Sequence, residues 1–251
     1  MTVEFSQPKN DDKNLDDRLQ SLLERLTVDE LSQRIAAVVM LGQSGDKRAV
    51  EPLIEILRNG EIELQLYAAE ALGKLKDSRA LSVLLEALSS PIWWLRSQAA
   101  AAIGAINHPS SVPILRAALR SRDELKRAGA VLALGWMRYR PLTNEIVKLL
   151  SDDHPWVRFN AVIATSLLSE RGVADKLIAL LNNPYEDDHV RGVAAQALGR
   201  MGIKKAIPLL QRLQTETASA FARAEATIAL ERLYTGTVRP ELFCVISFLD
   251  Q

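Results

Sequence analysis

The chain repeats a short pattern about every 31 residues, and this periodicity constrains its fold more than any other feature. The pattern reads R-x-x-A-x-x-A-L-G, and we call the position of its first residue the anchor. Successive anchors lie 31, 31, 31, 31, 33 and 32 residues apart; they are Arg34, Gln65, Arg96, Arg127, Arg158, Arg191 and Arg223. An alanine follows three positions after every anchor. Repeats of about 20–45 residues are typical of solenoids, in which each unit packs on its neighbours.

Each unit is expected to contain two helices. Residues three and four apart lie on one face of a helix, so the recurring alanines predict a first helix, helix A, that a neighbour approaches closely. A glycine eight positions after most anchors, as at Gly42 and Gly73, predicts the end of helix A. A second apolar run, as in 49–57 and 80–88, predicts helix B. The sequence therefore predicts an all-α fold, an α-solenoid of about seven helix pairs.

The two ends of the chain differ from the repeats. We expect a polar, mobile stretch over 1–14 and a single solenoid domain over 15–251. Leucine spacing predicts a capping helix over 15–26, and Thr27 with Glu30 predicts a capping box before the first helix A. The HEAT-like repeats discussed below fill 28–234, and a turn and a last helix fill 235–251. That last segment is more apolar than the other B helices, so it either packs on the stack or docks on a partner.

Composition and motifs exclude several classes of function. The 31 basic and 31 acidic residues cancel, which argues against a protein that binds nucleic acid through bulk charge. No stretch approaches the roughly 20 apolar residues of a membrane span, and the start lacks a signal sequence, so we expect a cytoplasmic protein without membrane insertion. The single cysteine and three histidines form no metal motif, nucleotide-binding loop or other self-contained catalytic constellation.

Aromatic residues are few, yet most tryptophans lie where one unit meets the next. Trp94 and Trp156 stand two positions before their anchors, with Leu125 between them and His189 beyond, which predicts a ridge across units three to six. Aromatic residues dominate binding hot spots, although packing between units is the alternative. The candidate binding residues are Trp93, Trp94, Trp136, Tyr139, Asp153, His154, Trp156, Tyr185, Asp188 and His189. The anchor arginines are expected to form a structural ladder that bonds carboxylates or turn carbonyls of neighbouring units.

The repeat resembles the short HEAT-like repeats first named for phycobilisome lyases. The match is closest in 34–57, 67–88 and 189–202, and it covers about 28–234. E/F-type phycobilin lyases of cyanobacteria and related phycobilisome-degradation factors share this repeat. The resemblance implies a phycobiliprotein or a second lyase-like subunit as partner. It implies no tightly bound cofactor and only transient contact with a bilin such as phycocyanobilin. Deoxyhypusine hydroxylases share the repeats too, but their paired His-Glu motifs are absent here.

Two functional hypotheses follow from the resemblance. In the first, the chain is a protein-binding factor of phycobilisome metabolism, either a bilin lyase subunit or a lyase-like chromophore chaperone. The reacting thiol would then belong to the phycobiliprotein, and the chain would be an enzyme at most as a lyase subunit. In the second, it is a scaffold or adaptor without a small ligand, for example a partner of iron–sulfur cluster assembly proteins. Both remain open at the level of the sequence.

Overall fold

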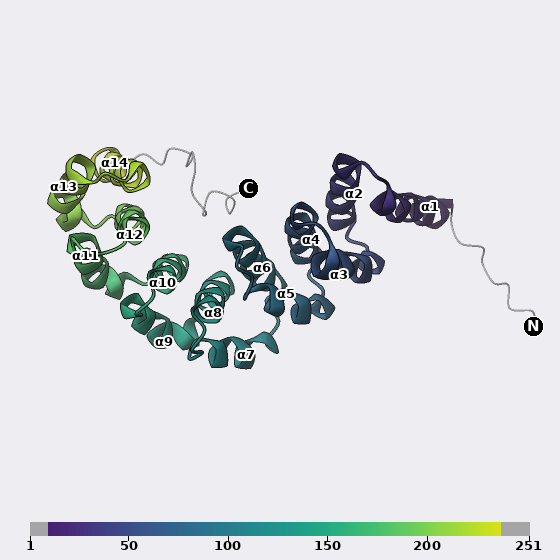
Figure 1. The fold of residues 1–251 in the computed structure, drawn as a ribbon, viewed down its shortest axis with the longest axis horizontal. Helices are drawn as coiled ribbons and strands as arrows, with labels where there is room; N and C mark the ends of the chain where they lie inside the picture. Colours follow the sequence, from purple (N-terminus) through teal and green to yellow (C-terminus); the bar gives the residue numbers. More distant parts are fainter. Residues whose placement is uncertain (1–9, 237–251) are drawn as a thin grey trace, which may run out of the picture.

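The computed structural model describes residues 10–236, and within this range it contains fourteen α-helices, seven 3-10 helices and no β-strand. The predicted all-α solenoid is confirmed. The helices follow one another along an open arc that begins at α1 and ends at α14 (Figure 1). From α7 onwards, the B helices occupy the outer side of the arc and the A helices its inner side.

The described residues contain seven A helices and six B helices. The A helices are α2 (Leu31–Ser44), α4 (Ile62–Leu75), α6 (Trp93–Ile106), α8 (Glu124–Trp136), α10 (Pro155–Leu167), α12 (Asp188–Arg200) and α14 (Ala220–Thr235). The B helices are α3 (Val50–Asn59), α5 (Leu81–Ala87), α7 (Ser111–Ala118), α9 (Thr143–Lys148), α11 (Ala174–Asn182) and α13 (Ile207–Glu216). The last helix expected within 235–251 falls almost wholly on residues 237–251, outside the described residues.

Short 3-10 helices connect most A helices to the B helices that follow them. These are η2 (Lys47–Ala49), η3 (Ser78–Ala80), η4 (Arg140–Leu142), η6 (Arg171–Val173) and η7 (Lys204–Ala206), while η5 (Leu149–Ser151) follows α9. In η2 and η3, Asp46 and Asp77 cap the turn, because each side chain accepts a hydrogen bond from the backbone N–H two residues later. The predicted tight turn between the helices of a unit is therefore a capped 3-10 turn in the first two units.

The alanine that follows each anchor by three positions forms the centre of the stack. All seven of these alanines are completely buried: Ala37, Ala68, Ala99, Ala130, Ala161, Ala194 and Ala226. Leucines of the B helices, such as Leu53, Leu84 and Leu115, are buried as well and join the same continuous core. A solenoid needs this arrangement, because one helix pair alone cannot bury both of its faces.

The recurring glycine has a different role from the one predicted. Gly73 and Gly135 lie in the last turn of α4 and α8, but these helices continue past them to Leu75 and Trp136. A Cβ atom added at Gly135 would lie 2.6 Å from the Cα of Ala164 in the next A helix, and one at Gly73 would lie 2.9 Å from the Cα of Ala102. The prediction that this glycine ends helix A is wrong: its missing side chain lets consecutive A helices meet backbone to backbone.

In the first six units helix A ends one or two residues later, and the chain then turns at a residue with positive φ. This position, eleven residues after the anchor, holds Gly45 (φ 72°), Lys76 (50°), Asn107 (48°), Arg138 (50°), Ser169 (53°) and Gly202 (71°). A left-handed residue at a helix C-terminus lets the chain bond back to the last carbonyls. Side chains other than glycine occupy most of these positions, so the sequence alone does not mark them.

The start of the solenoid also departs from the prediction. Helix α1 spans Asn10–Glu24, and η1 (Arg25–Thr27) follows it. The helix therefore begins inside the stretch expected to be mobile, since polarity alone does not end a helix. The predicted capping box is wrong: Glu30 is the N-cap of α2 without a side-chain cap, and the Thr27 hydroxyl donates instead to the Glu24 carbonyl at 2.9 Å. The 3-10 turn that ends at Thr27 keeps its side chain away from the α2 N-terminus.

Two junctions between A helices differ from the others. A Cβ atom at Gly104 of α6 would meet Trp136, whereas the other helical glycines of this column face the alanine six positions after the next anchor. Helices α6 and α8 therefore pack in a register displaced by three residues, close to one helical turn. Between α10 and α12, Ser166 replaces the glycine, and a cleft lined by Arg138, Ser166 and Met201 opens there.

Candidate functional site

The candidate residues lie at opposite ends of the A helices. Trp93 and Trp94 begin α6, Trp156 stands in the first turn of α10, and His189 in the first turn of α12. We call this end of the A helices the N-terminal edge. Trp136 is the last residue of α8, so it lies at the other end of the helix. The structure therefore brings together only part of the predicted set.

Aromatic rings form a row along the N-terminal edge of the last three A helices. The ring centroids of Trp156 and His189 are 5.9 Å apart, and those of His189 and Phe221 are 5.5 Å apart. Phe159 supports Trp156 edge-on at 5.5 Å. We call Trp156, His189 and Phe221 the aromatic row. Sequence analysis missed Phe221, although it stands two positions before its anchor as Trp94 and Trp156 do.

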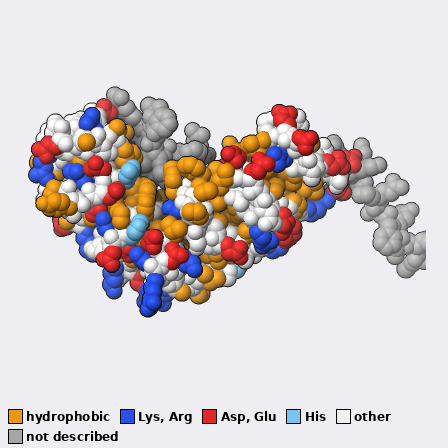
Figure 2. Space-filling model, viewed as in Figure 1, with side chains coloured by type: hydrophobic (Ala, Val, Ile, Leu, Met, Phe, Trp, Pro, Cys, Tyr) orange, Lys and Arg blue, Asp and Glu red, His pale blue; other side chains and the backbone are white. Residues whose placement is uncertain are grey.

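Trp93 and Trp94 continue the aromatic surface on α6. Their rings meet edge to face at 5.5 Å, and both side chains are exposed, Trp94 by 48%. Hydrophobic side chains gather on the inner side of the arc in its middle part, with histidine beside them (Figure 2). Exposed tryptophans on one side of a fold are unusual in a surface that meets only water, and they indicate a binding surface.

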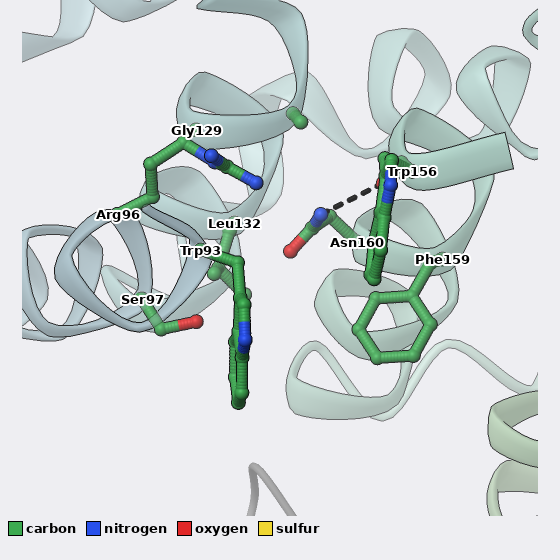
Figure 3. Close-up of a pocket in the computed structure, with 9 residues that line it drawn as sticks. Trp93, Arg96, Ser97, Gly129, Leu132, Trp156, Phe159 and Asn160 are labelled. Carbon is green, nitrogen blue, oxygen red and sulfur yellow. Dashed lines mark hydrogen bonds between the residues drawn. The ribbon is translucent and has the colours of Figure 1, made fainter. Parts of the chain in front are cut away.

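A shallow cleft lies between the tryptophans of α6 and α10. Trp93, Arg96 and Ser97 line it from α6, Ala128, Gly129 and Leu132 from α8, and Trp156, Phe159 and Asn160 from α10. We call it the tryptophan cleft. Figure 3 shows the rings of Trp93 and Trp156 on opposite sides of it, with the Asn160 side chain between them and the Arg96 guanidinium pointing inward. Its cavity volume is about 10 Å³, which holds about one water molecule.

Anchor arginines hold neighbouring units together below the N-terminal edge. Arg127 binds the Asp152 carboxylate with Nε at 2.9 Å and Nη2 at 2.8 Å. Arg158 binds Glu186 in the same way, with Nη2 at 2.5 Å. Each also donates to the carbonyl six residues earlier, that of Ser121 or Asp152. The predicted structural ladder is confirmed for these two units.

The ladder changes the ionisation of its members. The hydrogen bonds and charge of Asp152 raise the pKa of Arg127. Burial raises the pKa of Asp152, but hydrogen bonds from Arg127 and the His154 N–H outweigh it and leave that pKa below its usual value. The side chain of Glu186 is only 4% exposed, and sequence analysis missed its role. Asp152 therefore acts as a negatively charged partner of Arg127, and Glu186 accepts the hydrogen bonds of Arg158.

Arg96 differs from Arg127 and Arg158. Its side chain is buried, with only 6% of the residue exposed, and its Nη1 donates to the Ser90 carbonyl at 2.5 Å. No carboxylate among residues 10–236 pairs with it. Burial lowers its pKa, yet a guanidinium stays protonated at neutral pH. The tryptophan cleft therefore contains a buried positive charge that no acid of the described chain neutralises.

The candidate residues of the junction loops have mainly local roles. His154 is the N-cap of α10, and its Nδ1 accepts from the Trp156 N–H at 3.3 Å. The Asp153 carbonyl accepts from Arg158, and the Asp188 carboxylate accepts from Arg191 at 3.2 Å. Tyr185 is 95% exposed and lies in the loop before α12. Helix capping and ion pairing account for His154 and Asp188.

Trp136 and Tyr139 belong to the opposite end of the A helices. Both are half-buried and pack against the core, and Trp136 fills the space beside Gly104. The larger cleft near this end is lined by Arg138, Arg171 and Arg200, and the Arg138 guanidinium donates to the Leu167 carbonyl at the end of α10. Basic side chains at helix C-termini satisfy the last carbonyls, so this cleft is explained by capping.

A metal-ligand cluster and a membrane-spanning helix are both absent from residues 10–236. No group of three or more His, Cys, Asp or Glu side chains within residues 10–236 is arranged to hold a metal ion. Over the same residues, every helix is too short or too polar to span a bilayer. What the N-terminal edge can do chemically is bind: it offers aromatic faces, one buried cation and hydrogen-bonding side chains such as Asn160.

Comparison with known proteins identifies the repeat. The profile of HEAT repeats matches residues 19–96, 83–145, 112–186 and 143–231. These overlapping matches cover nearly all of the described residues. No curated protein matches the sequence significantly.

Solved structures share the architecture at low sequence identity. Kap121p bound to Pho4p has a TM-score of 0.64 and 14% identity over 91% of this chain and 31% of Kap121p. The complex of CpcE and CpcF of phycocyanin lyase from Nostoc sp. PCC7120 has a TM-score of 0.49 and 20% identity over 93% of this chain and 98% of that one. Human deoxyhypusine hydroxylase has a TM-score of 0.41 and 16% identity over 89% and 98%. The likeness to Kap121p shows a shared fold and nothing further.

Proposed function

This chain belongs to the family of HEAT-repeat proteins, and from that premise we propose that it works by binding another protein along the N-terminal edge of its A helices. The observation that carries the proposal is the set of exposed tryptophans Trp93, Trp94 and Trp156 on one edge. Tryptophan contributes large contact area at a low entropic cost and recurs at the centres of interfaces. A solenoid presents such residues on an extended surface that suits a protein partner.

We propose further that the partner is a phycobiliprotein, and that the chain holds a bilin transiently as a lyase subunit or chromophore chaperone. The repeat pattern supports this, because it resembles that of E/F-type phycobilin lyases in 34–57 and 67–88. The surface chemistry is also suitable. Indole rings stack on conjugated pyrroles, and arginine pairs with propionate groups. The bilin would lie across the aromatic row, because the tryptophan cleft is too small to enclose it.

Phycocyanobilin titration tests the bilin part of the proposal. A red-shifted absorption band and stronger fluorescence are expected when the chain is mixed with phycocyanobilin, alone or with phycocyanin apoprotein. The double variant Trp94→Ala/Trp156→Ala should lose the band. Tyr234→Ala is the matched control, because Tyr234 is an exposed aromatic residue at the far end of α14. No spectral change under any of these conditions would contradict bilin binding and leave protein binding untouched.

The adaptor hypothesis is the second candidate, and the small volume of the tryptophan cleft favours it. A protein that binds only other proteins, for example an adaptor in iron–sulfur cluster assembly, needs no cavity for a small ligand. Affinity capture with the wild-type chain and with Trp94→Ala/Trp156→Ala distinguishes the two. Phycobiliproteins retained only by the wild type support the first hypothesis, and a different partner with the same dependence supports the second.

A further inference from the structure

Arg96 is the most buried anchor arginine, and unlike four of the others it has no acidic partner within the described residues. Arg127 and Arg158 each bind a carboxylate of the following junction in bidentate geometry. Arg34 and Arg191 also have acidic partners, Glu61 and Asp188 at 3.1 and 3.2 Å. Arg96 is more buried than these four, yet it makes one hydrogen bond, to a carbonyl. A guanidinium has five N–H donors, so most of its bonding capacity is unused within the described chain.

At the spacing of the Arg127–Asp152 pair, the sequence offers Arg96 no acid, and Asp123, 27 residues after Arg96, caps α8 instead. Asp152 stands 25 residues after Arg127, and the residue 25 positions after Arg96 is Ser121. The Ser121 hydroxyl is engaged elsewhere, because it accepts from the Asp123 N–H at 3.1 Å. The displaced register of α6 and α8 occurs at the same junction. The third unit therefore keeps the buried arginine without the carboxylate that pairs with Arg34, Arg127, Arg158 and Arg191.

The N-terminus of α6 makes the electrostatic potential near Arg96 more positive. Its N-cap is Ile92, which offers no side-chain acceptor, whereas Asp123, Asp187 and Ser219 cap α8, α12 and α14 with side-chain oxygens. The first N–H groups of α6 consequently lack a side-chain cap, and the positive end of the helix dipole lies one turn from Arg96. Both features favour a negative group near the cleft.

The shape of the tryptophan cleft limits what can reach Arg96. The guanidinium points between the rings of Trp93 and Trp156 (Figure 3), and the cavity admits a group of about one water molecule. A carboxylate at the end of a side chain can approach through this opening. The remainder of the ligand must lie outside, on indole rings that are exposed by 42% at Trp93 and 37% at Trp156. An apolar or aromatic stretch of polypeptide suits that surface.

We propose that the tryptophan cleft binds the carboxylate of an Asp or Glu side chain of the partner protein, which completes the arginine ladder in trans. The inference rests on the proposed function, because it takes a protein partner on this edge as given. The acid would take the role at Arg96 that Asp152 has at Arg127. Apolar residues next to it would cover Trp93 and Trp156, exclude water and strengthen the ion pair.

Peptide display on the folded full-length chain tests the inference without knowledge of the partner. A random heptapeptide library is selected against the wild type and against Arg96→Gln, with melting followed by circular dichroism for both. Peptides enriched on the wild type should share an acidic residue beside apolar or aromatic residues. Peptides enriched on Arg96→Gln should lack the acidic preference. Enrichment on the wild type without an acidic consensus overturns the inference and leaves the docking function intact. No enrichment on either chain contradicts the docking function, and the inference with it.

A matched peptide pair measures the interaction directly. The best acidic peptide and its Glu→Gln or Asp→Asn counterpart are titrated into both chains by fluorescence anisotropy. On the wild type the amide peptide should bind about tenfold more weakly, as expected for a charge-assisted hydrogen bond at a desolvated site. On Arg96→Gln the two peptides should differ less than twofold. An equal acid preference on both chains would place the carboxylate elsewhere and overturn the inference.

Ser121→Asp provides a second variant in case Arg96→Gln does not fold. It places a carboxylate at the position that Asp152 occupies in the next unit, where it can neutralise Arg96 within the chain. The acid preference should then fall while affinity for the amide peptide stays the same. If Ser121→Asp melts like the wild type and still binds the acidic peptide more tightly than the amide peptide, Arg96 is not the residue that binds the carboxylate.

Discussion

The two ends of the A helices differ, although both repeat with the same period: one packs the units together and the other presents exposed side chains. At the C-terminal ends, Gly73 and Gly135 meet the backbone of the next A helix, and nothing larger than a hydrogen atom fits. At the N-terminal edge, buried arginine–carboxylate pairs connect the units, and tryptophans lie exposed above them. The first end varies little, and where Ser166 replaces the glycine a cleft opens between α10 and α12. The second varies from unit to unit, so it is where a repeat protein can encode a binding surface.

The largest effect is expected from the ion pair below the N-terminal edge. Glu186→Gln removes the buried partner of the half-buried Arg158, and breaking such a pair costs about 3 kcal/mol of unfolding free energy. Urea denaturation measures this loss. Glu55→Gln is the control, because its pair with Arg58 is exposed and contributes less than about 1 kcal/mol. Equal losses in the two variants would mean that the N-terminal edge is not held by buried charges.

A smaller loss is expected at the C-terminal ends. Gly199→Ala places a Cβ 2.7 Å from the Cα of Ala229, and forcing the helices apart should cost about 2 kcal/mol. Gly202→Ala, three residues later, has open space but a φ of +71°, and should cost only about 1 kcal/mol. The same denaturation experiment compares them. The reverse order would show that turn geometry, and not the close approach of helices, makes glycine necessary here.

Acid should weaken the N-terminal edge selectively. The pKa of Asp152 is lowered in the folded state, so its contribution to stability is present above the unfolded value of about 3.9 and is lost as pH falls through the folded value. Asp152→Asn should therefore be less stable than the wild type by about 1–2 kcal/mol at pH 7. The difference should shrink as the pH falls below 4. A difference that stays constant down to pH 2.5 would contradict this assignment.

The fold could be predicted because the same packing contacts recur in every unit. Part of the site could not be predicted, because it depends on contacts that occur in only one unit. The alanine column specified the solenoid. The glycine column was misinterpreted, since a glycine near a helix end looks the same whether it stops the helix or admits a neighbour. The tryptophan column predicted Trp94, Trp156 and His189. Glu186 was missed because no fixed spacing joins an anchor arginine to its acid: Asp152 follows Arg127 by 25 residues and Glu186 follows Arg158 by 28. The tryptophan cleft depends on the register of α6 and α8, which no local pattern encodes.

The smallest effect on stability is expected from the loss of an exposed tryptophan at the N-terminal edge, compared with a packed tryptophan at the other end of an A helix. Trp94 is 48% exposed at the N-terminal edge, so Trp94→Ala should change the unfolding free energy by less than about 1 kcal/mol. Trp136→Ala, at the C-terminal end of α8, should cost about 2 kcal/mol because it empties a packed, half-buried position beside Gly104.

Binding should follow the opposite order. Peptides selected on the wild type should bind Trp94→Ala several-fold more weakly, because an exposed interface tryptophan contributes contact area without supporting the fold. Trp136→Ala should bind them as the wild type does at temperatures where it remains folded. If Trp94→Ala loses stability as Trp136→Ala does and keeps its affinity, the tryptophans of both ends are packing residues, and the N-terminal edge has no separate binding role. Differences in residue type along the N-terminal edge would then reflect only weaker packing constraints. This pair of variants therefore decides whether the exposed aromatic residues bind a partner.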